Sequence, residues 1–240
     1  MTIREMHYDL KVRLNKLDSS QYRNIRIPEI DRKLNEAANL LVRSIAFPRI
    51  AENIGFEKNQ RTIDDIRTIV VDDFTINTTT TDNISFYATL PALSPKIYEY
   101  YIDSKAMALK GSCTLKPCDV IIRRHGDKHE NSPFDESSFE WREVNAHFVG
   151  NTIKYFSDGT FLIPNIKLDF IKKMAYMHNA QDFPGATYTL PNGTVLTGFV
   201  NCELPDIIHS EVLDLAVLII SGEINTADLQ FKMMKQQLNQ

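Results

Sequence analysis

A histidine pair, the cysteines and two pairs of adjacent aspartates are the residues of this 240-residue chain whose types could do chemistry. His125 and His129 are four residues apart, a spacing that on a helix places two imidazoles on one face and suits a metal ion. Gly126 and the polar residues around the pair predict a loop instead, and no third ligand follows at a suitable spacing. A solvated loop is therefore the better interpretation of this pair.

The cysteines and aspartates also have a plainer interpretation. Cys113 and Cys118 have no second cysteine pair with which to form a zinc site. With Cys202 they make an odd count in a chain whose first residues lack the apolar run of a signal peptide, so we expect reduced, packed thiols. Asp64-Asp65 and Asp72-Asp73 could bind a divalent cation or act in acid–base catalysis. Because adjacent residues on a helix face different ways, we expect no catalytic residue, no metal and no cofactor.

The elements that must position these residues begin with helices at the start of the chain. Thr2 followed by Glu5 is a capping box, and apolar residues at helical spacing extend the predicted helix over 2–14. A second helix is predicted over 28–47, opened by Pro28 and by acidic residues, among them Asp31, that complement the positive end of its dipole. Thr62 opens a third, shorter helix that ends at about residue 69.

The rest of the chain changes from strands to helices. From Phe74 onward β-branched and aromatic runs predict strands, with turns at Asp158-Gly159, where TIKYF and TFLIP should form a hairpin, and at Pro191-Asn192-Gly193. A short helix is predicted near Leu168–Met177 and a polar loop over 123–138. Two closing helices follow at 205–221, ended by Gly222, and at 225–236. The predicted fold is α+β: a helical bundle from both chain termini (1–69 plus 205–240) with an inserted β-rich domain (70–204).

Composition excludes several classes of function. The formal net charge is −4, which gives no strong global attraction to nucleic acid or to an anionic membrane. The longest apolar run, Leu215–Ile220, is far shorter than a membrane span. We therefore expect no membrane partner.

Three segments carry candidate interface residues. The helix at 205–221 is apolar over so wide an arc that it must be covered on two sides, either by its own bundle or by a neighbouring subunit. The closing segment has methionines and a phenylalanine, which suit docking but could equally pack back on the bundle. The loop before the second helix could meet an acidic partner or a phosphate backbone, or could be simply solvated. The candidate interface residues are Tyr22, Arg23, Arg26, Val212, Leu213, Val217, Ile220, Phe231, Met233, Met234 and Leu238.

The two ends of the chain resemble a known family. The first residues, and within them LNKLDS (14–19) and PEIDRKLNEA (28–37), are similar to the start of structural neck and tail proteins of crAss-like bacteriophages. The end, HSEVLDLAVLIISGEINTADLQFKMMKQQLNQ, looks like the closing helices of the same family, and TIKYFSDGTFLIPNIKLDFIKK is similar in character.

This resemblance implies a virion structural protein and not an enzyme. It implies a homo-oligomeric ring, dodecameric to match a portal, that connects the portal to the tail as a head–tail connector or adaptor. Its partners would be the portal protein and other neck and tail proteins, with genomic DNA passing through the lumen without specific binding. The protein would be located in the virion and assembled in the host cytoplasm. Two alternatives stay open: a metal-dependent enzyme that uses His125 and His129, and a cytoplasmic DNA-binding module that uses Arg23, Arg26 and Arg32.

Overall fold

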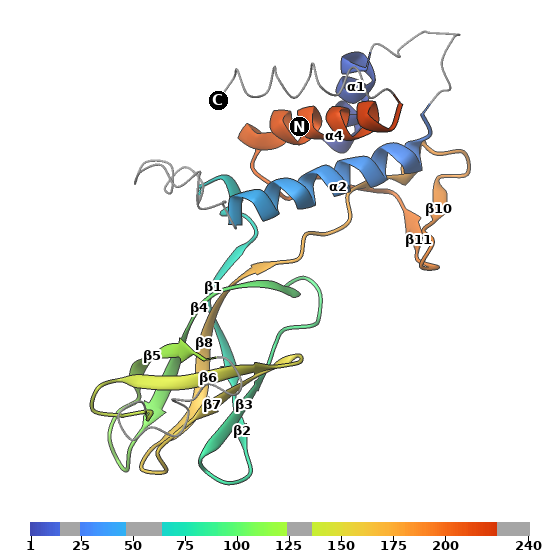
Figure 1. Cartoon of the computed structure of the whole chain (residues 1–240). Coiled ribbons are helices and arrows are strands. Elements are labelled where there is room, and N and C mark those ends of the chain that lie inside the picture. Colours follow the sequence, from blue (N-terminus) through green and yellow to red (C-terminus); the bar gives the residue numbers. More distant parts are fainter. Residues whose placement is uncertain (15–24, 47–63, 124–135, 225–240) are drawn as a thin grey trace, which may run out of the picture. The chain divides into compact units, whose positions relative to one another are not determined.

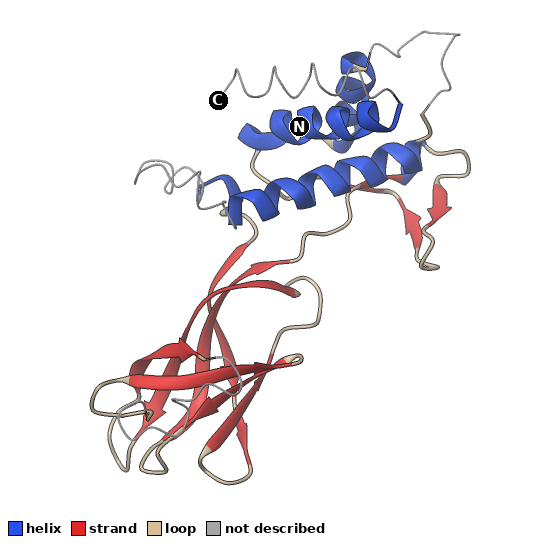
Figure 2. Cartoon of the chain, viewed as in Figure 1, coloured by secondary structure: helices blue, strands red, loops and turns tan. Residues whose placement is uncertain are grey.

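A computed structural model describes residues 1–14, 25–46, 64–123 and 136–224 of the chain. The chain divides into two compact units (Figure 1). Unit 1 combines residues 1–68 with 174–240, and unit 2 consists of residues 69–173. Figure 2 shows the difference between them: described helices dominate unit 1, whereas unit 2 is built of strands.

Unit 2 is an eight-stranded sheet in the order β1-β8-β4-β5-β6-β7-β3-β2. Neighbouring strands are antiparallel, except that β5 and β6 are parallel. Because β3 also lies close to β1 and β8, the sheet is curled and its two ends approach each other. The strands are β1 (Val70–Asn77), β2 (Thr79–Thr80), β3 (Ser85–Thr89), β4 (Tyr98–Leu109), β5 (Lys116–Ile122), β6 (Glu143–Val149), β7 (Thr152–Phe156) and β8 (Leu162–Lys172).

The inside of the curled sheet is the core of unit 2. The side chains of β7 alternate, so that Ile153 and Tyr155 are buried while Lys154 is directed outward. In the same way β8 buries Leu168 and Phe170. This period of two explains why these runs form strands, as the sequence predicts for most of them.

Two local predictions in this region are wrong. The chain does turn at Asp158-Gly159, with Gly159 at φ +82°, but β7 pairs with β3 and β6 whereas β8 pairs with β1 and β4. A turn signal specifies the reversal of the chain and not which strand lies beside it. The helix predicted near Leu168–Met177 is instead the end of β8, which pairs with β1 and β4 on its two sides, followed by a segment without helix or strand.

Unit 1 combines helices with short strand pairs. The helices α1 (Ile3–Arg13) and α2 (Ile27–Ala46) both pack against α4 (His209–Ile224). The capping box of α1 is confirmed, since Thr2 and Glu5 satisfy each other's backbone N–H groups. Between β8 and α4 in the sequence, unit 1 has two antiparallel strand pairs and two short 3-10 helices. The pairs are β9 (His178–Asn179) with β12 (Phe199–Val200) and β10 (Thr187–Thr189) with β11 (Val195–Thr197), and the 3-10 helices are η2 (Ala180–Asp182) and η3 (Asp206–Ile208).

The predicted fold class is therefore wrong. The structure is mostly β, with 37% of its residues in strands and 29% in helices, and is not a helical bundle with a β insertion. Residues 174–204 belong to unit 1, because their short strands pair with one another and β9 lies against α1 and α2. The helix predicted to end at Gly222 continues to Ile224. The start of the helix predicted from Thr62, the loop core at 124–135 and the helix at 225–236 lie outside the described residues.

Candidate functional site

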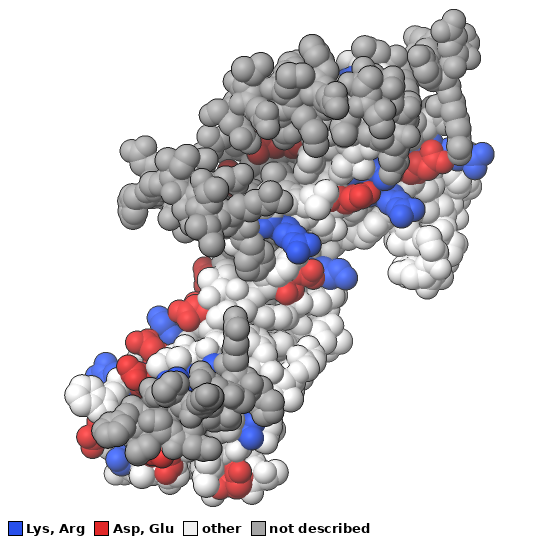
Figure 3. Space-filling model, viewed as in Figure 1, with Lys and Arg blue, Asp and Glu red and all other residues white. Residues whose placement is uncertain are grey.

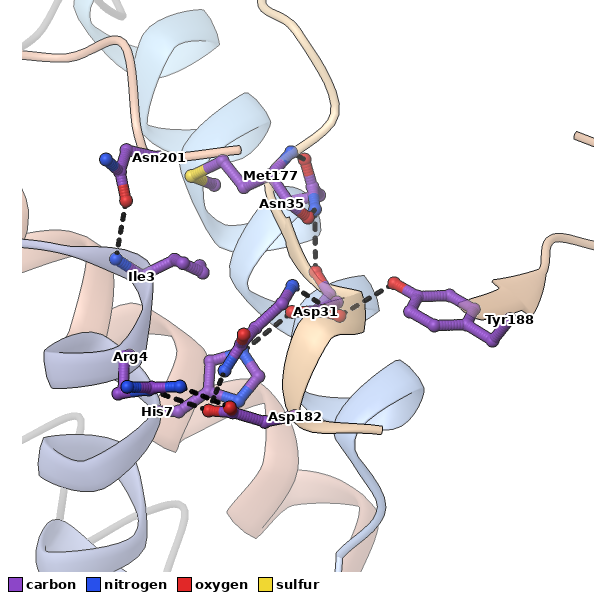
Figure 4. Close-up of polar contacts among 10 residues, drawn as sticks. Ile3, Arg4, His7, Asp31, Asn35, Met177, Asp182, Tyr188 and Asn201 are labelled. Atoms are coloured by element: carbon purple, nitrogen blue, oxygen red, sulfur yellow. Dashed lines mark hydrogen bonds and ion pairs between the residues drawn. The ribbon is translucent and has the colours of Figure 1, made fainter. Parts of the chain in front are cut away.

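The strongest concentration of buried polar groups in the described chain surrounds Asp31, in the second turn of α2 (Figure 4). Asp31 is completely buried. One carboxylate oxygen lies 2.7 Å from His7 Nε2, and the other accepts a hydrogen bond of 2.7 Å from the Tyr188 hydroxyl and one of 3.2 Å from the Asn179 backbone N–H. We call Asp31, His7, Tyr188 and Asn179 the Asp31 cluster. It joins α1, α2, β9 and β10 at a single carboxylate.

Asn35, one turn further along α2, adds a second connection. Its side-chain amide donates to the backbone carbonyl of Met177 at 2.7 Å, and its carbonyl accepts from the Met177 N–H at 2.9 Å. The same amide donates to the Asp31 carbonyl at 2.7 Å. Asn35 therefore satisfies both backbone polar groups of Met177 and fixes the residue before β9 against α2.

The outer side of the cluster is held by α1. Arg4 on α1 forms a bidentate ion pair with Asp182, in which Arg4 Nε donates at 2.8 Å. The side-chain amide of Asn179 donates to the same carboxylate at 2.8 Å. The hydrogen bond from Arg4 lowers the pKa of Asp182 below its usual range. Near the start of α1, the Ile3 N–H donates to the Asn201 side chain at 2.9 Å.

Burial dominates the electrostatics around Asp31. It raises the pKa of Tyr188, an effect that the hydrogen bond to Asp31 and its negative charge reinforce. Burial and the same negative charge raise the pKa of Tyr176. Burial lowers the pKa of His178, and the attraction of Asp31 only partly opposes it. Tyr188 therefore stays neutral at neutral pH and keeps the hydroxyl hydrogen that it donates to the Asp31 carboxylate.

A histidine beside a buried aspartate is also the arrangement that orients a catalytic base. In that arrangement the far imidazole nitrogen is presented to a substrate, whereas His7 is only 5% exposed. Both oxygens of Asp31 are occupied by donors from other segments. The geometry therefore fits a structural clamp, in which loss of one partner would leave a buried charge or donor unpaired.

The structure describes five of the eleven candidate interface residues. Val212, Leu213, Val217 and Ile220 on α4 are buried within unit 1, so they form part of its core and present no open contact surface. Coverage by its own unit thus accounts for the wide apolar arc of this helix. Arg26 is exposed just before α2, and its backbone carbonyl accepts from the N–H of Ile30. The remaining six, Tyr22, Arg23, Phe231, Met233, Met234 and Leu238, lie outside the described residues.

Among the described residues, those weighed for metal or acid–base chemistry are not brought together. Within the described ranges no three His, Cys, Asp or Glu side chains are placed to hold a metal ion. Asp73 sits at a bulge in β1 with φ +53° and pairs with Lys167 at 3.2 Å. All three cysteines are free, and of these Cys118 is buried while Cys113 is exposed. His125 and His129 lie in the part of the chain that is not described.

The Asp31 cluster is the site that sequence reasoning missed. From the sequence, Asp31 is expected only to complement the positive end of the helix dipole. A usable signal existed, because Asp31 lies between Ile30 and Leu34 on the arc that α2 buries. A charged residue on a buried arc must have partners.

In comparisons with known proteins, no protein-family model and no curated protein matches the sequence of this chain. No helix within the described ranges is long and apolar enough to cross a membrane.

Proposed function

We propose that this chain is a virion structural protein of the phage neck or tail, which forms an oligomeric ring that connects the portal to the tail and lets DNA pass. The proposal starts from the resemblance of the chain ends to structural proteins of crAss-like phages. A ring of identical subunits needs two different contact surfaces on each copy, joined head to tail. Each subunit of such a ring must also have a stable fold of its own.

The observation that supports it is where the resembling segments lie. PEIDRKLNEA forms the first half of α2 and contains both Asp31 and Asn35, the two residues that fasten unit 1 together. The described part of the closing phrase forms α4, which packs on α1 and α2. PEIDRKLNEA and the described part of the closing phrase thus help to build unit 1 from two distant parts of the chain, whereas TIKYFSDGTFLIPNIKLDFIKK belongs to unit 2 and LNKLDS after Leu14 lies outside the described residues.

The experiment is to mix the purified full chain with purified portal and to measure mass by light scattering, with electron microscopy of the same sample. We expect a complex whose mass corresponds to one ring per portal and annular particles in projection. A chain that stays monomeric and does not bind the portal would contradict the proposal. Stoichiometric metal in elemental analysis, or salt-sensitive binding of duplex DNA by the isolated chain, would favour the enzyme or the DNA-binding alternative.

A further inference from the structure

Unit 1 holds histidines in its interior. Every histidine that the structure describes is buried, and three of the four, His7, His178 and His209, belong to unit 1. The ordinary pKa of a histidine, about 6.5, places its change of charge close to neutral pH. Along α2, Figure 3 shows blue and red side chains next to one another at the surface, where water screens their charges. A moderate fall in pH therefore acts mainly on the interior of this unit.

His178 has a ring nitrogen that is enclosed without a partner. It lies in β9, which pairs with β12 and packs against α1 and α2. Its Nδ1 is buried and has no hydrogen-bond partner among the described residues. A protonated imidazole carries a hydrogen on both nitrogens, so the charged form of His178 would bury an N–H without an acceptor.

The charged groups of the elements around β9 already have other partners. Asp31 on α2 attracts a proton on His178, but its two oxygens accept from other donors. On α1, His7 faces Asp31 with Nε2 at 2.7 Å, and Arg4 is paired with Asp182. β12 consists of uncharged residues. His7 thus has an acceptor in place, whereas His178 has none.

His209, the first residue of α4, is enclosed in a similar way. Its Nε2 donates to the Leu204 carbonyl at 2.9 Å, and its Nδ1 is buried without a hydrogen-bond partner in the described chain. Asp206 in η3 lies 3.3 Å from this Nδ1, but the same carboxylate oxygen accepts from the N-terminal ammonium at 2.5 Å. A cation at the first residue of α4 also meets the positive end of the helix dipole. Protonated His209 would therefore compete for its one carboxylate in an unfavourable field.

The folded unit consequently disfavours both protons. Burial lowers the pKa of His178 and of His209, and the attractions of Asp31 and Asp206 only partly oppose it. An opened chain takes up these protons at the ordinary pKa, so acidification through about 6.5 favours the opened form. The pKa values of Asp182 and Asp206 are lowered, so these carboxylates stay ionised throughout that range.

We infer that unit 1 contains an acid-sensitive switch, in which protonation of His178 and His209 loosens the packing of β9 and α4 on α1 and α2 while unit 2 stays closed. Both histidines lie in elements that join parts of unit 1 distant in the sequence. In the described part of unit 2, no buried side-chain nitrogen or oxygen lacks a hydrogen-bond partner. The switch is a property of the single chain, so its failure would leave the proposed ring untouched.

The test is hydrogen exchange of the full chain, followed by mass spectrometry, with each rate divided by that of the unfolded chain at the same pH. Between pH about 7.5 and about 5.5 we expect the protection of amides in α1, α2, β9 and α4 to fall by up to about tenfold for each of the two histidines. The strands of unit 2 are the internal reference and should keep their protection. No fall in unit 1, or an equal fall in both units, would overturn the inference.

Glutamine variants assign the response to the two histidines. His178→Gln and His209→Gln keep a polar side chain that takes up no proton in this range, and the new amide at position 209 can still donate to the Leu204 carbonyl. Each variant is compared with itself at the two pH values, so that a change in its overall stability cancels. The double variant should lose the fall in unit 1, whereas His147→Gln, at a buried histidine of unit 2, should retain it. A double variant that responds to pH as the wild type does would refute the switch.

The wild type alone supplies a second measurement if a variant fails to fold. In NMR spectra of the chain with ¹³C-labelled histidine, the His178 and His209 signals should remain those of neutral imidazole as long as unit 1 is closed. Titration of both side chains at about the ordinary pKa of 6.5 within the closed unit would overturn the inference.

Discussion

Replacement of Asp31 by alanine is the most informative perturbation of unit 1. The substitution removes the acceptor of three hydrogen bonds and leaves the donors of His7, Tyr188 and Asn179 without a partner in a buried site. Hydrogen bonds to a charged group contribute about 1.5–3 kcal/mol each. Their sum overstates the loss, because the variant no longer has to bury a charge. Breaking a buried ionic network by removal of one member costs about 3–5 kcal/mol, and we expect a value in this range.

The assay is urea unfolding of the full chain combined with hydrogen exchange followed by mass spectrometry. We expect faster exchange of the amides in α1, α2 and β9, whereas the strands of unit 2 should exchange as in the wild type, since the donors to Asp31 all belong to unit 1. Tyr188→Phe, which removes one donor and keeps the ring, should cost about 1.5–3 kcal/mol.

Glu36→Ala is the matched control for Asp31→Ala. Glu36 is an exposed carboxylate on the same helix, paired with Lys33, and such a surface pair contributes about 0–1 kcal/mol. Tyr8→Phe, at an exposed tyrosine of α1, is the control for Tyr188→Phe. An Asp31→Ala variant no less stable than Glu36→Ala would refute the clamp.

Three further predictions concern other parts of unit 1. Burial lowers the pKa of His178 in the folded protein below the ordinary 6.5, so the unfolded chain binds the proton more readily. The free energy of unfolding should therefore fall as the pH drops through about 6.5. His178→Gln should weaken that fall, measured by urea titrations at pH about 7 and about 5. Thr2→Ala should cost about 1 kcal/mol by removal of the capping box, measured as urea stability, while Thr2→Ser should retain most of it. Gly193→Ala should destabilise the β10–β11 turn by about 1 kcal/mol, because Gly193 has φ +84° and the added methyl group would meet no other atom, so that only the backbone conformation is disfavoured. Amide exchange should become faster in the hairpin and not elsewhere. Unchanged exchange in the hairpin would contradict this prediction.

Local signals in the sequence predict much of the secondary structure. The capping box at Thr2 places the start of α1 correctly, and the apolar period from Ile30 onward places α2 within one residue at each end. The turn at Asn192-Gly193 is confirmed as the loop between β10 and β11. These features depend on neighbours in sequence, which a pattern can report.

Features that depend on distant partners could not be predicted in this way. β6 (Glu143–Val149) was not predicted, and the order of the strands follows from the curl of the sheet, which no local turn signal encodes. Residues 174–204 have strand-like texture, yet they belong with the helices because Asp31 and Asn35 bind them. The role of Asp31 depends on His7 and Tyr188, which lie 24 and 157 residues away in the sequence.

The central claim, that this chain is a structural component of a virion, is tested most directly by quantitative mass spectrometry of purified phage particles, with the portal protein as the internal reference. The proposal predicts that peptides of this chain are present at a copy number comparable to that of the portal and that they remain after stringent washing of the particles. Absence of the chain from the particles, or a copy number far below that of the portal, would contradict it.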